Sequence, residues 1–391
     1  MRLLVLSFYY QPDLSAGSFR ATALVRALRA RAAPGTHIEV LTTLPNRYHT
    51  FEQPAEELES QPGLEIRRIP LPRHRSDILG QSRAFARFAR RAWSHVADRE
   101  YDVVYATSSR LMTATLGAAI ARRKHALLYL DIRDIFVDTI GEMLPRSVSI
   151  PVKAIFSRVE AWTVRRASRI NLVSPGFEEY FRTRYGASSF AWFTNGIDDE
   201  FLPVQPEAAH VPHEGRATIV YAGNIGEGQG LHQILPALAH ALRDRARFVV
   251  IGDGGRRRQL EEALALAGLN NVELRAPIPR PQLIEVYRDA DVLLIHLGRH
   301  AAFEKVLPSK LFEYAALGKP VLAGVAGYAA RFVREEISNA AVFTPCDARA
   351  AVAALGTLRL EDRPRPEFVA KYARSRIALA MADDVLALGR A

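Results

Sequence analysis

The chain has 391 residues, a formal net charge of +10 and a hydrophobic share of 49%. This length suits two domains, and the composition excludes a disordered or collagen-like chain. The single cysteine, Cys346, excludes an internal disulfide and a multi-cysteine zinc site, and it is typical of a reducing cytoplasm. The longest uncharged apolar runs, such as residues 111–121, are about half the ~20 residues of a membrane-spanning helix, so no such helix is expected.

Short apolar runs alternate with helical patterns in the first half of the chain. Residues 1–10 are interpreted as leading into the first strand rather than as a signal peptide, because polar residues follow at once. The predicted order is a strand at 3–8, a helix at 21–30, and strands at 38–42, 64–69, 103–106, 126–130, 170–173 and 190–194. Such alternation is typical of a parallel sheet with crossover helices, so residues 1–197 predict one doubly wound α/β domain.

A second domain of the same class follows a proline-rich stretch. Pro203, Pro206 and Pro212 leave no room for a regular element, so residues 198–216 are predicted to be an interdomain linker. Strands are then predicted at 217–222, 248–251, 272–274, 292–296, 320–323 and 341–343, within a domain over 217–365. The helical spacing of apolar residues in 366–391 predicts a closing helix that packs back across the interface. Ligands of open α/β sheets bind at the carboxyl ends of the strands, so the strand-to-helix loops should hold the site.

The loop after the first strand opens a helix and places Gly17 where backbone N–H groups could approach an anion or an acceptor hydroxyl. It lacks the G-x-G-x-x-G pattern of dinucleotide sites. We expect Ser15, Gly17 and Arg20 to bind an acceptor. The alternative is a plain strand-to-helix turn.

Asp131, Arg133 and Asp134 come just past the strand that is predicted to end at Leu130. Carboxylates at this position could orient an acceptor hydroxyl or stabilise positive charge on a sugar ring, so Asp131 and Asp134 are predicted to be catalytic. The alternative is a surface cluster whose charges neutralise one another.

Two glycine-rich loops mark the second domain. Residues 223–230 contain four glycines between a strand and a helix, an arrangement that brings main-chain donors onto one spot and suits a diphosphate. Residues 252–258 repeat the arrangement and add three arginines, of which Arg256 is expected to face the cleft. A purely conformational glycine cluster is the alternative. The predicted donor-binding residues in this part of the chain are Gly223, Asn224, Gly226, Gln229, Gly252, Arg256, Pro277 and Ile278.

The most informative stretch lies late in the second domain. Pro308 at a helix start leaves the amides of Ser309 and Lys310 unpaired beside the Lys310 ammonium, which predicts an anion site. One turn further on, Glu313 could accept both hydroxyls of a ribose, and Glu304 could hold hydroxyls of a sugar. Ordinary helix capping is the alternative. Ser309, Lys310, Leu311 and Glu313 are predicted to bind the donor, with Lys310 and Glu304 also assigned to catalysis.

Asp289 and Asp291 superficially match the D-x-D pair that holds a divalent metal in another class of sugar transferase. They fall at a helix end that leads into a strand, so a capping or structural role is expected, and neither a metal site nor a cofactor is predicted. His296 is expected to be a strand-end or core histidine rather than a ligand.

A pI near 9.8 indicates an anionic partner, which could be nucleic acid, a phosphorylated substrate or a lipid surface. Residues 73–91 contain six arginines against one acid, Asp77. On a helical wheel, Phe85 and Phe88 share an apolar face, and the opposite face carries Arg83, Arg87, Arg90 and Arg91. This pattern fits either an ordinary surface helix or attachment to anionic lipid, and Arg83 and Arg87 are also assigned to acceptor binding.

Taken together, these motifs resemble those of the GT-B glycosyltransferases, and specifically the retaining enzymes of glycosyltransferase family four. The resemblance covers almost the whole chain and rests on the order and spacing of the Gly17 loop and residues 35–42, 195–198, 221–226, 308–314 and 318–320. It implies two Rossmann-like domains facing across a cleft, the first for the acceptor and the second for the nucleotide sugar. It also implies that Glu313 holds the ribose, that Lys310 holds the diphosphate, and that Gly223 and Asn224 form the phosphate loop.

The sequence departs from the family pattern in three places. Asn224 and Gln229 stand where Arg and Lys are common, so Lys310 and Arg256 are left to neutralise the diphosphate. Glu304 and Glu313 have eight residues between them, whereas the family's glutamate pair has seven. Asp131 stands where many members have a histidine.

The resemblance implies transfer of a hexosyl or N-acetylhexosaminyl group, with retention, from a nucleotide diphosphate sugar. A UDP-sugar donor is favoured, and the expected acceptor is a lipid-linked saccharide in bacterial surface-polysaccharide synthesis. We expect peripheral attachment to the anionic cytoplasmic face of the inner membrane and no nucleic-acid partner. The alternatives are a nucleotide-sugar epimerase on the same fold and a catalytically silent sugar-nucleotide-binding scaffold. An NAD oxidoreductase is disfavoured because neither glycine loop has dinucleotide spacing.

Overall fold

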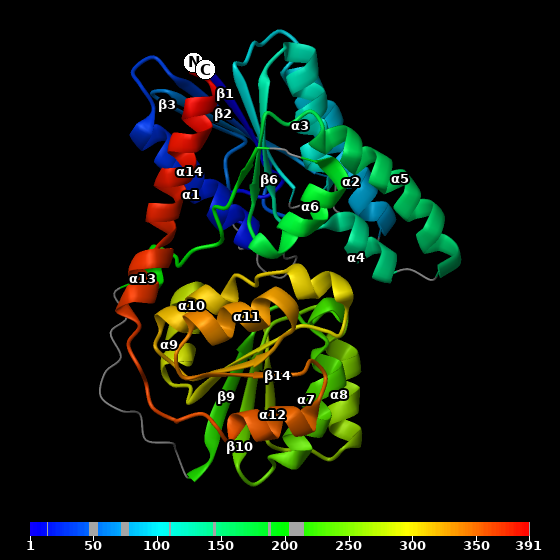
Figure 1. Ribbon diagram of the computed structural model, residues 1–391, viewed down its shortest axis with the longest axis vertical. Helices are drawn as coiled ribbons and strands as arrows, with labels where there is room; N and C mark the ends of the chain where they lie inside the picture. Colours follow the sequence, from blue (N-terminus) through cyan, green and yellow to red (C-terminus); the bar gives the residue numbers. More distant parts are fainter. Residues whose placement is uncertain are drawn as a thin grey trace. The chain divides into compact units, whose positions relative to one another are not determined.

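The computed structural model describes residues 1–13, 15–46, 54–71, 78–108, 111–143, 146–186, 189–202 and 215–390. The chain divides into two compact units (Figure 1). The first combines Met1–Asn195 with Arg374–Ala391, and the second is Gly196–Ala373. Each unit contains a sheet of mainly parallel strands with helices against it, which confirms the prediction of two doubly wound α/β sheets.

The sheet of the first unit has the strand order β3-β4-β2-β1-β5-β6-β7-β8. Its strands are β1 Arg2–Leu6, β2 His37–Thr43, β3 Leu58–Gln61, β4 Leu64–Ile69, β5 Val103–Thr107, β6 Leu127–Ile132, β7 Arg169–Leu172 and β8 Phe190–Ala191. All pairings are parallel except that of β3, a short edge strand antiparallel to β4 that the sequence analysis did not predict. β1 lies between β2 and β5, so the strand order reverses direction at its carboxyl end.

The helices of the first unit are α1 Ala16–Arg31, α2 Ile78–His95, α3 Leu111–Lys124, α4 Phe136–Met143, α5 Arg146–Val164, η1 Pro175–Phe177, α6 Glu178–Tyr185 and α14 Arg374–Leu388. Helix α14 comes from the end of the chain but packs on α1. Leu24 and Leu28 of α1 share a buried core with Met381 and Val385 of α14. The last helix is therefore part of the first unit.

The tail contains two helices where a single closing helix was predicted. α13 (Pro366–Tyr372) ends at Ala373, whose backbone is extended (φ −54°, ψ 124°), and α14 begins at the next residue. The interruption coincides with a β-bridge between Ile197 and Ala373, in which the Ile197 N–H donates to the Tyr372 carbonyl at 2.8 Å. This non-local pairing overrides the helical pattern of the tail.

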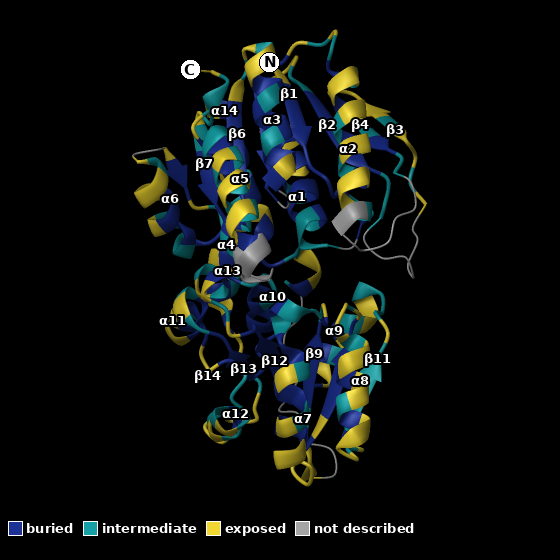
Figure 2. Cartoon of the chain, turned by 90° about the vertical axis from the view of Figure 1, so that its right-hand side faces the viewer, coloured by how far each residue is buried: buried dark blue, intermediate teal, exposed yellow. Residues whose placement is uncertain are grey.

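The sheet of the second unit is parallel throughout, with the order β11-β10-β9-β12-β13-β14. Its strands are β9 Ala217–Ala222, β10 Ala246–Ile251, β11 Val272–Arg275, β12 Val292–His296, β13 Val321–Gly324 and β14 Ala340–Phe343. Its helices are η2 Asp199–Phe201, η4 Glu227–Gln229, α7 Leu231–Ala241, α8 Arg257–Leu266, α9 Arg280–Arg288, η5 Ala301–Lys305, α10 Lys310–Ala316, α11 Gly327–Glu336, α12 Ala348–Leu355 and α13. Figure 2 shows the central strands of both sheets as buried and the outer helix faces as exposed, whereas the edge strands β3 and β11 are less buried.

Part of the predicted linker lies within the described residues. Residues 198–202 belong to the second unit, where Phe201 is buried. Residues 203–214 lie outside the described residues, as do residues 73–77 of the predicted basic segment. Among the described helices, none is both long and apolar enough to cross a bilayer.

Candidate functional site

The second unit has one point where the strand order reverses, between β9 and β12. The chain runs outward from β9 through β10 to β11, then returns to the other side of β9 as β12. The loops that leave β9 and β12 therefore diverge from adjacent strand ends, which is where open α/β sheets bind ligands. These loops are the first glycine-rich loop and the segment that leads to α10, as the motifs predicted.

The two glycine loops are held together by their backbones. The Gly223 N–H donates to the Ile251 carbonyl at 2.8 Å, and the Ile225 N–H donates to the Asp253 carbonyl at 2.9 Å. A Cβ on Gly252 would lie 1.8 Å from the Gly223 carbonyl oxygen. Glycine is therefore required at position 252, because any side chain would separate the two loops.

Lys310 lies directly over the first glycine of the β9 loop. A Cβ on Gly223 would lie 2.8 Å from Lys310 Cε, so the end of the lysine side chain would have to move, and the backbone of Gly223 has a φ of +155° that favours glycine. Burial lowers the pKa of the Lys310 ammonium, and the charge of Glu313 opposes that change. The structure thus brings together Gly223 and Lys310, two residues predicted to bind the donor.

Other polar side chains of the glycine loops form hydrogen bonds or ion pairs with neighbouring residues. Asn224 Nδ2 donates to Gln229 Oε1 at 2.7 Å, and Arg256 pairs with Glu227. Of the next two arginines, Arg257 donates to the Arg275 carbonyl at 2.9 Å, and Arg258 is 91% exposed. The charge of Arg256 is thus partly balanced by an acid that sequence reasoning did not consider.

The segment η5 packs on the β9 loop and carries Glu304. A Cβ on Gly228 would lie 2.9 Å from the Phe303 ring, and one on Gly327 would lie 2.2 Å from the Glu304 carbonyl oxygen. The backbone of Glu304 is therefore fixed between the β9 loop and α11, while its side chain is exposed.

Helix α10 begins at Lys310 with Ser309 as its N-cap residue. Among the described residues, neither the Ser309 N–H nor the Lys310 N–H has a hydrogen-bond acceptor. The Leu311 side chain is completely buried and its N–H donates to the Pro308 carbonyl at 3.2 Å, and the donor-binding role of Leu311 stays a prediction.

Glu313 lies on α10 beside an arginine that the sequence analysis missed. Arg280 Nη2 is 3.4 Å from Glu313 Oε1, and both side chains are mostly buried. Pro277 and Ile278 lie half-buried in the segment that leads from β11 to Arg280. The only sequence signal for Arg280 was its place in a strand-to-helix loop.

His296 has a structural role, as expected. Its ring is buried, with Nδ1 2.6 Å from the Gln229 carbonyl oxygen and Nε2 accepting the Cys346 N–H at 2.9 Å. Burial lowers the pKa of His296 to about 4, although the Gln229 carbonyl opposes this, so the ring is neutral at pH 7. The neutral ring ties the end of β12 to the β9 loop.

Two further groups of residues contain side chains that can bind a metal ion. Asp291 is buried and accepts the Thr218 N–H at 2.7 Å, whereas Asp289 caps the end of α9, which favours the structural interpretation of this pair. Among the described residues, the metal-capable side chains that gather are Glu39, Glu65 and His95. Arg99 reaches both carboxylates of that group, at 3.2 and 3.6 Å, so it is already an ion-pair network.

In the first unit, the predicted acceptor loop ends in a helix cap. Ser15 is the N-cap of α1, and its Oγ accepts the Ser18 N–H at 3.2 Å. Gly17 lies in the first turn of α1 rather than in the preceding loop. This geometry fits the alternative of a plain strand-to-helix turn, and the acceptor role of the two residues stays a prediction.

The predicted positions of Asp131 and Arg20 are wrong. Asp131 lies within β6 and is completely buried, and Arg20 is 5% exposed. Arg20 Nε donates to Asp131 Oδ2 at 2.8 Å and Arg20 Nη2 donates to Oδ1 at 2.9 Å, while Tyr105 and Asn171 each donate at 2.7 Å. Four donors saturate both carboxylate oxygens, so Asp131 does not project from the strand end and has no free lone pair directed at a substrate.

Electrostatics explains why this buried pair is stable. Burial alone would raise the pKa of Asp131, but the charge and hydrogen bonds of Arg20 hold it below its usual value. Arg20 also donates to the Thr194 carbonyl at 2.8 Å and the Phe193 carbonyl at 2.7 Å. The pair therefore connects α1 and β6 to the segment that follows β8.

The other predicted residues of the first unit are accessible. Asp134 is exposed just beyond β6, and Arg133 Nη1 donates to the Ala16 carbonyl at 3.1 Å. Arg83 and Arg87 are exposed on α2, and Arg87 Nε donates to the Pro70 carbonyl at 3.1 Å.

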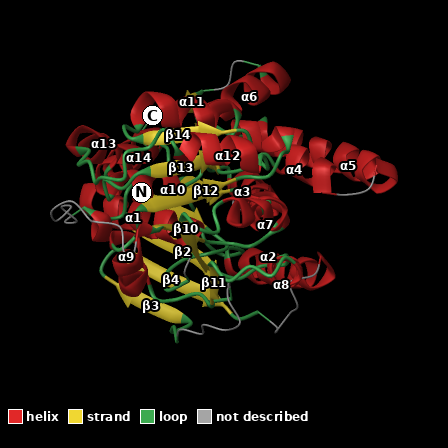
Figure 3. Cartoon of the chain, turned by 90° about the horizontal axis from the view of Figure 1, so that it is seen from below, coloured by secondary structure: helices red, strands yellow, loops and turns green. Residues whose placement is uncertain are grey.

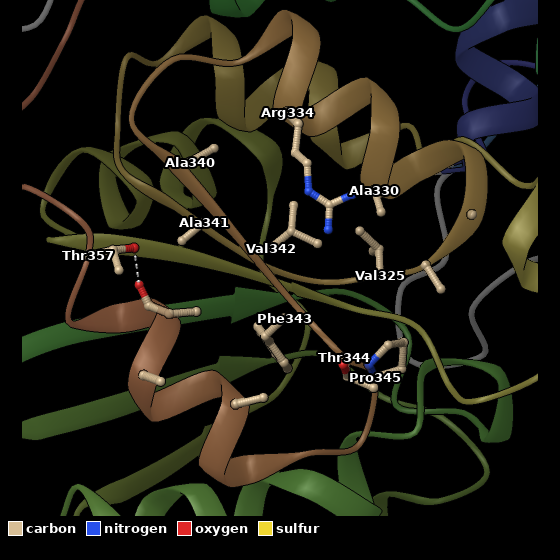
Figure 4. Close-up of a pocket in the computed structure, with 15 residues that line it drawn as sticks. Val325, Ala330, Arg334, Ala340, Ala341, Val342, Phe343, Thr344, Pro345 and Thr357 are labelled. Carbon is tan, nitrogen blue, oxygen red and sulfur yellow. Dashed lines mark hydrogen bonds between the residues drawn. The ribbon is translucent and has the colours of Figure 1, made fainter.

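A separate groove of about 800 Å³ runs along β14 between α11 and α12 (Figure 4). Small side chains such as Ala330, Ala341 and Ala354 line it, and Arg334 extends into it. None of the residues predicted to bind donor or acceptor lines this groove, so it is not part of the candidate site.

The two halves of the chain match two families of glycosyltransferase domains. Residues 17–189 match the Glycosyl transferase 4-like domain, and residues 206–376 match Glycosyl transferases group 1. Together with the two parallel sheets, these matches support a GT-B glycosyltransferase, the class that the sequence motifs resembled.

Two curated relatives are similar in sequence. The chain is 26% identical to 2-deoxystreptamine glucosyltransferase of Streptomyces kanamyceticus over 331 residues, which cover 78% of this chain and 80% of that one. It is 36% identical over 106 residues to the putative colanic acid biosynthesis glycosyl transferase WcaI of Escherichia coli K12. That match covers 27% of this chain and spans only 26% of the relative.

Solved structures share the fold over the whole chain. WaaG, a glycosyltransferase involved in lipopolysaccharide biosynthesis, has a TM-score of 0.64 at 16% identity, covering 100% of this chain and 98% of that one. Anabaena HepE in complex with UDP-glucose has a TM-score of 0.61 at 15% identity, covering 100% and 97%. These similarities confirm the GT-B fold.

Arg20→Met should lower the free energy of unfolding by about 3–5 kcal/mol, because it leaves the Asp131 carboxylate buried without its cation. Arg26→Met, on the exposed face of the same helix, should change it by less than about 0.5 kcal/mol. Urea denaturation followed by circular dichroism measures both. Equal stability of the two variants would contradict the structural role of the Arg20–Asp131 pair.

Proposed function

We propose that this chain is a retaining glycosyltransferase that moves a sugar from a UDP-sugar to a hydroxyl of a lipid-linked saccharide. The observation that carries the proposal is the position of Lys310 over Gly223, where the strand order of the second sheet reverses. Unpaired amides and a cation at this point suit a diphosphate, and Glu313 lies one turn further along α10 to accept ribose hydroxyls.

In this mechanism the bond between the anomeric carbon and the diphosphate breaks, and the bond to the acceptor oxygen forms on the same face of the sugar. The acceptor proton passes to the departing phosphate oxygen, so no protein nucleophile is needed. The residues of the chain supply position and charge: Lys310 meets the negative charge that grows on the leaving group, and Glu304 is assigned to sugar hydroxyls. Electrostatic stabilisation is then the main catalytic term.

The relatives support the choice of donor and pathway. HepE has been solved with UDP-glucose, and WaaG and WcaI are described as acting in lipopolysaccharide and colanic acid biosynthesis. We therefore favour a UDP-hexose or UDP-N-acetylhexosamine donor and an acceptor that belongs to a growing bacterial surface glycan.

We assign the acceptor to the first unit. Asp134 remains the candidate carboxylate there because its side chain is exposed, whereas Asp131 and Arg20 are buried against each other. Ser15 and Gly17, at the carboxyl side of the central strand β1, are the candidate contacts for the acceptor hydroxyl.

We further propose that the first unit attaches peripherally to the anionic cytoplasmic face of the inner membrane. On α2, Phe88 is buried and packs on Phe8, so the apolar face is used internally. Its outer face presents the exposed arginines 83, 87, 90 and 91. Helix α5, which projects from the same unit in Figures 1 and 3, adds Ile150 and Ile155 with 70% and 59% of their surfaces exposed.

Purified protein should show a ligand-dependent rise in Tm with UDP and UDP-sugars, because a ligand at 100 times its Kd adds about 2.7 kcal/mol to the free energy of unfolding. GDP, ADP and their sugars are the matched comparison. Turnover of the stabilising donor should require an added saccharide acceptor. Conversion of the donor without acceptor would indicate an epimerase instead, and binding without turnover across an acceptor panel would indicate a scaffold.

Lys310→Ala should lower kcat by roughly 100-fold or more, since losing one donor to a developing anion typically costs that much. Glu313→Ala should mainly weaken donor binding and raise KM. Arg258→Ala is the matched control, because it removes an exposed cation from the neighbouring helix and should leave both constants unchanged. A Lys310→Ala enzyme with near-normal kcat would show that the leaving group is stabilised elsewhere.

Replacing arginines 83, 87, 90 and 91 by glutamine should weaken binding to anionic vesicles by roughly 100-fold to 1,000-fold, because each basic residue near the surface contributes ~1 kcal/mol. The control replaces the exposed arginines 243, 245, 258 and 349 of the second unit and changes the net charge equally. Vesicle sedimentation at low and high salt gives the measurement. Equal loss in both variants, or salt-independent binding to neutral vesicles, would contradict attachment through α2.

A further inference from the structure

Arg280, the first residue of α9, is the centre of a largely buried charge cluster. Its side chain is only 12% exposed and contacts three carboxylates: it pairs with Asp198, its Nε is 2.6 Å from Glu200 Oε2, and its Nη2 is 3.4 Å from Glu313 Oε1. The guanidinium carbon also lies 5.0 Å from the centre of the Phe201 ring. A planar guanidinium can satisfy several carboxylates at once, which a lysine ammonium does less well.

The three carboxylates come from two parts of the chain. Asp198 and Glu200 belong to the ordered segment at the start of the second unit, and Glu313 lies on α10, one turn beyond Lys310. Burial alone would lower the pKa of Arg280, but Glu313 and Asp198 raise it above its usual value. Arg280 therefore stays charged and holds α10 to the segment at 198–201.

The arrangement leaves Glu313 partly free. Arg280 Nη2 donates to Oε1 of Glu313 at 3.4 Å, and no described residue donates a hydrogen bond to Oε2, so Oε2 can accept a hydroxyl group. An ion pair at one oxygen fixes the orientation of the whole carboxylate. Recognition of adjacent ribose hydroxyls requires such a fixed orientation.

We propose that Arg280 is a positioning residue for donor recognition. It orients Glu313 toward the ribose, and its own position is fixed by its ion pairs with Asp198 and Glu200. This inference rests on the proposed function, because it assigns a nucleotide to Glu313. Arg280 acts through Glu313 and does not itself touch the donor.

A purely structural ion pair and a positioning residue differ in one measurable respect. Loss of a structural contact weakens all ligands of the second unit alike. Loss of a group that orients Glu313 affects only the part of the binding energy that comes from ribose hydroxyls, so it lowers discrimination between UDP and 2′-deoxy-UDP.

The experiment measures the Kd of UDP and of 2′-deoxy-UDP by isothermal titration calorimetry on the full chain. Wild type should prefer UDP. Arg280→Ala should weaken UDP binding about tenfold or more, the effect of losing a hydrogen bond to a charged group, and 2′-deoxy-UDP binding much less. Arg280→Lys should recover only part of the preference. Glu313→Ala should abolish the preference, and adding Arg280→Ala to it should have little further effect.

Arg288→Ala is the matched control, because Arg288 ends the same helix, is largely exposed and pairs only locally with Glu285 at 2.6 Å. It should leave both affinities unchanged. Thermal melting checks that each variant is folded, and if Arg280→Ala unfolds, Arg280→Lys decides by its nucleotide preference alone.

Unchanged UDP affinity in Arg280→Ala, or equal weakening of both nucleotides, would overturn the inference and leave the proposed function standing. A wild-type chain that binds neither nucleotide would overturn the proposed function, and the positioning role with it. The two failures are therefore distinguishable by the wild-type titration.

Discussion

The first unit depends on one buried ion pair, that of Arg20 and Asp131. A buried carboxylate is costly unless its oxygens are fully satisfied, and here four donors from α1, β5 and β7 satisfy them. The remaining Arg20 donors take the carbonyls of Phe193 and Thr194, which immediately precede the end of the first unit at Asn195. The same pair thus fixes the helix after β1 and the point where the chain leaves the unit.

The second unit depends on close backbone approach as well as on the charge cluster of Arg280. Gly252 lets two loops touch, and Gly223 leaves room for the stem of Lys310. The steric reason for glycine at these positions holds with or without a ligand. A purely conformational role for the glycine cluster was therefore a reasonable alternative to diphosphate binding. The amides of Ser309 and Lys310, which no described residue satisfies, are what make the same geometry suitable for an anion.

The alternation of elements predicted both sheets, because buried parallel strands leave a strong local signal in sequence. Pairings between distant residues leave none. The bridge from Ile197 to Ala373 split the predicted closing helix, and Arg20 turned Asp131 from an expected catalytic group into a core residue. Arg280 was missed for the same reason, since its partners lie 33 to 82 residues away. A single sequence thus located the loops of the site but not the partners that orient its side chains.

The net charge of +10 is not spread evenly over the surface of the chain. In the glycine loops and on α8, Arg256, Arg257 and Arg258 are each paired with a glutamate, so their charges are already balanced. Lys310 has no such salt bridge among the described residues, and its neighbour Glu313 is engaged by Arg280. In the proposed function, a diphosphate that reaches this loop would meet Lys310 as a cation that no salt bridge among the described residues already holds. The attraction would then act on the leaving group, where negative charge grows as the glycosidic bond breaks.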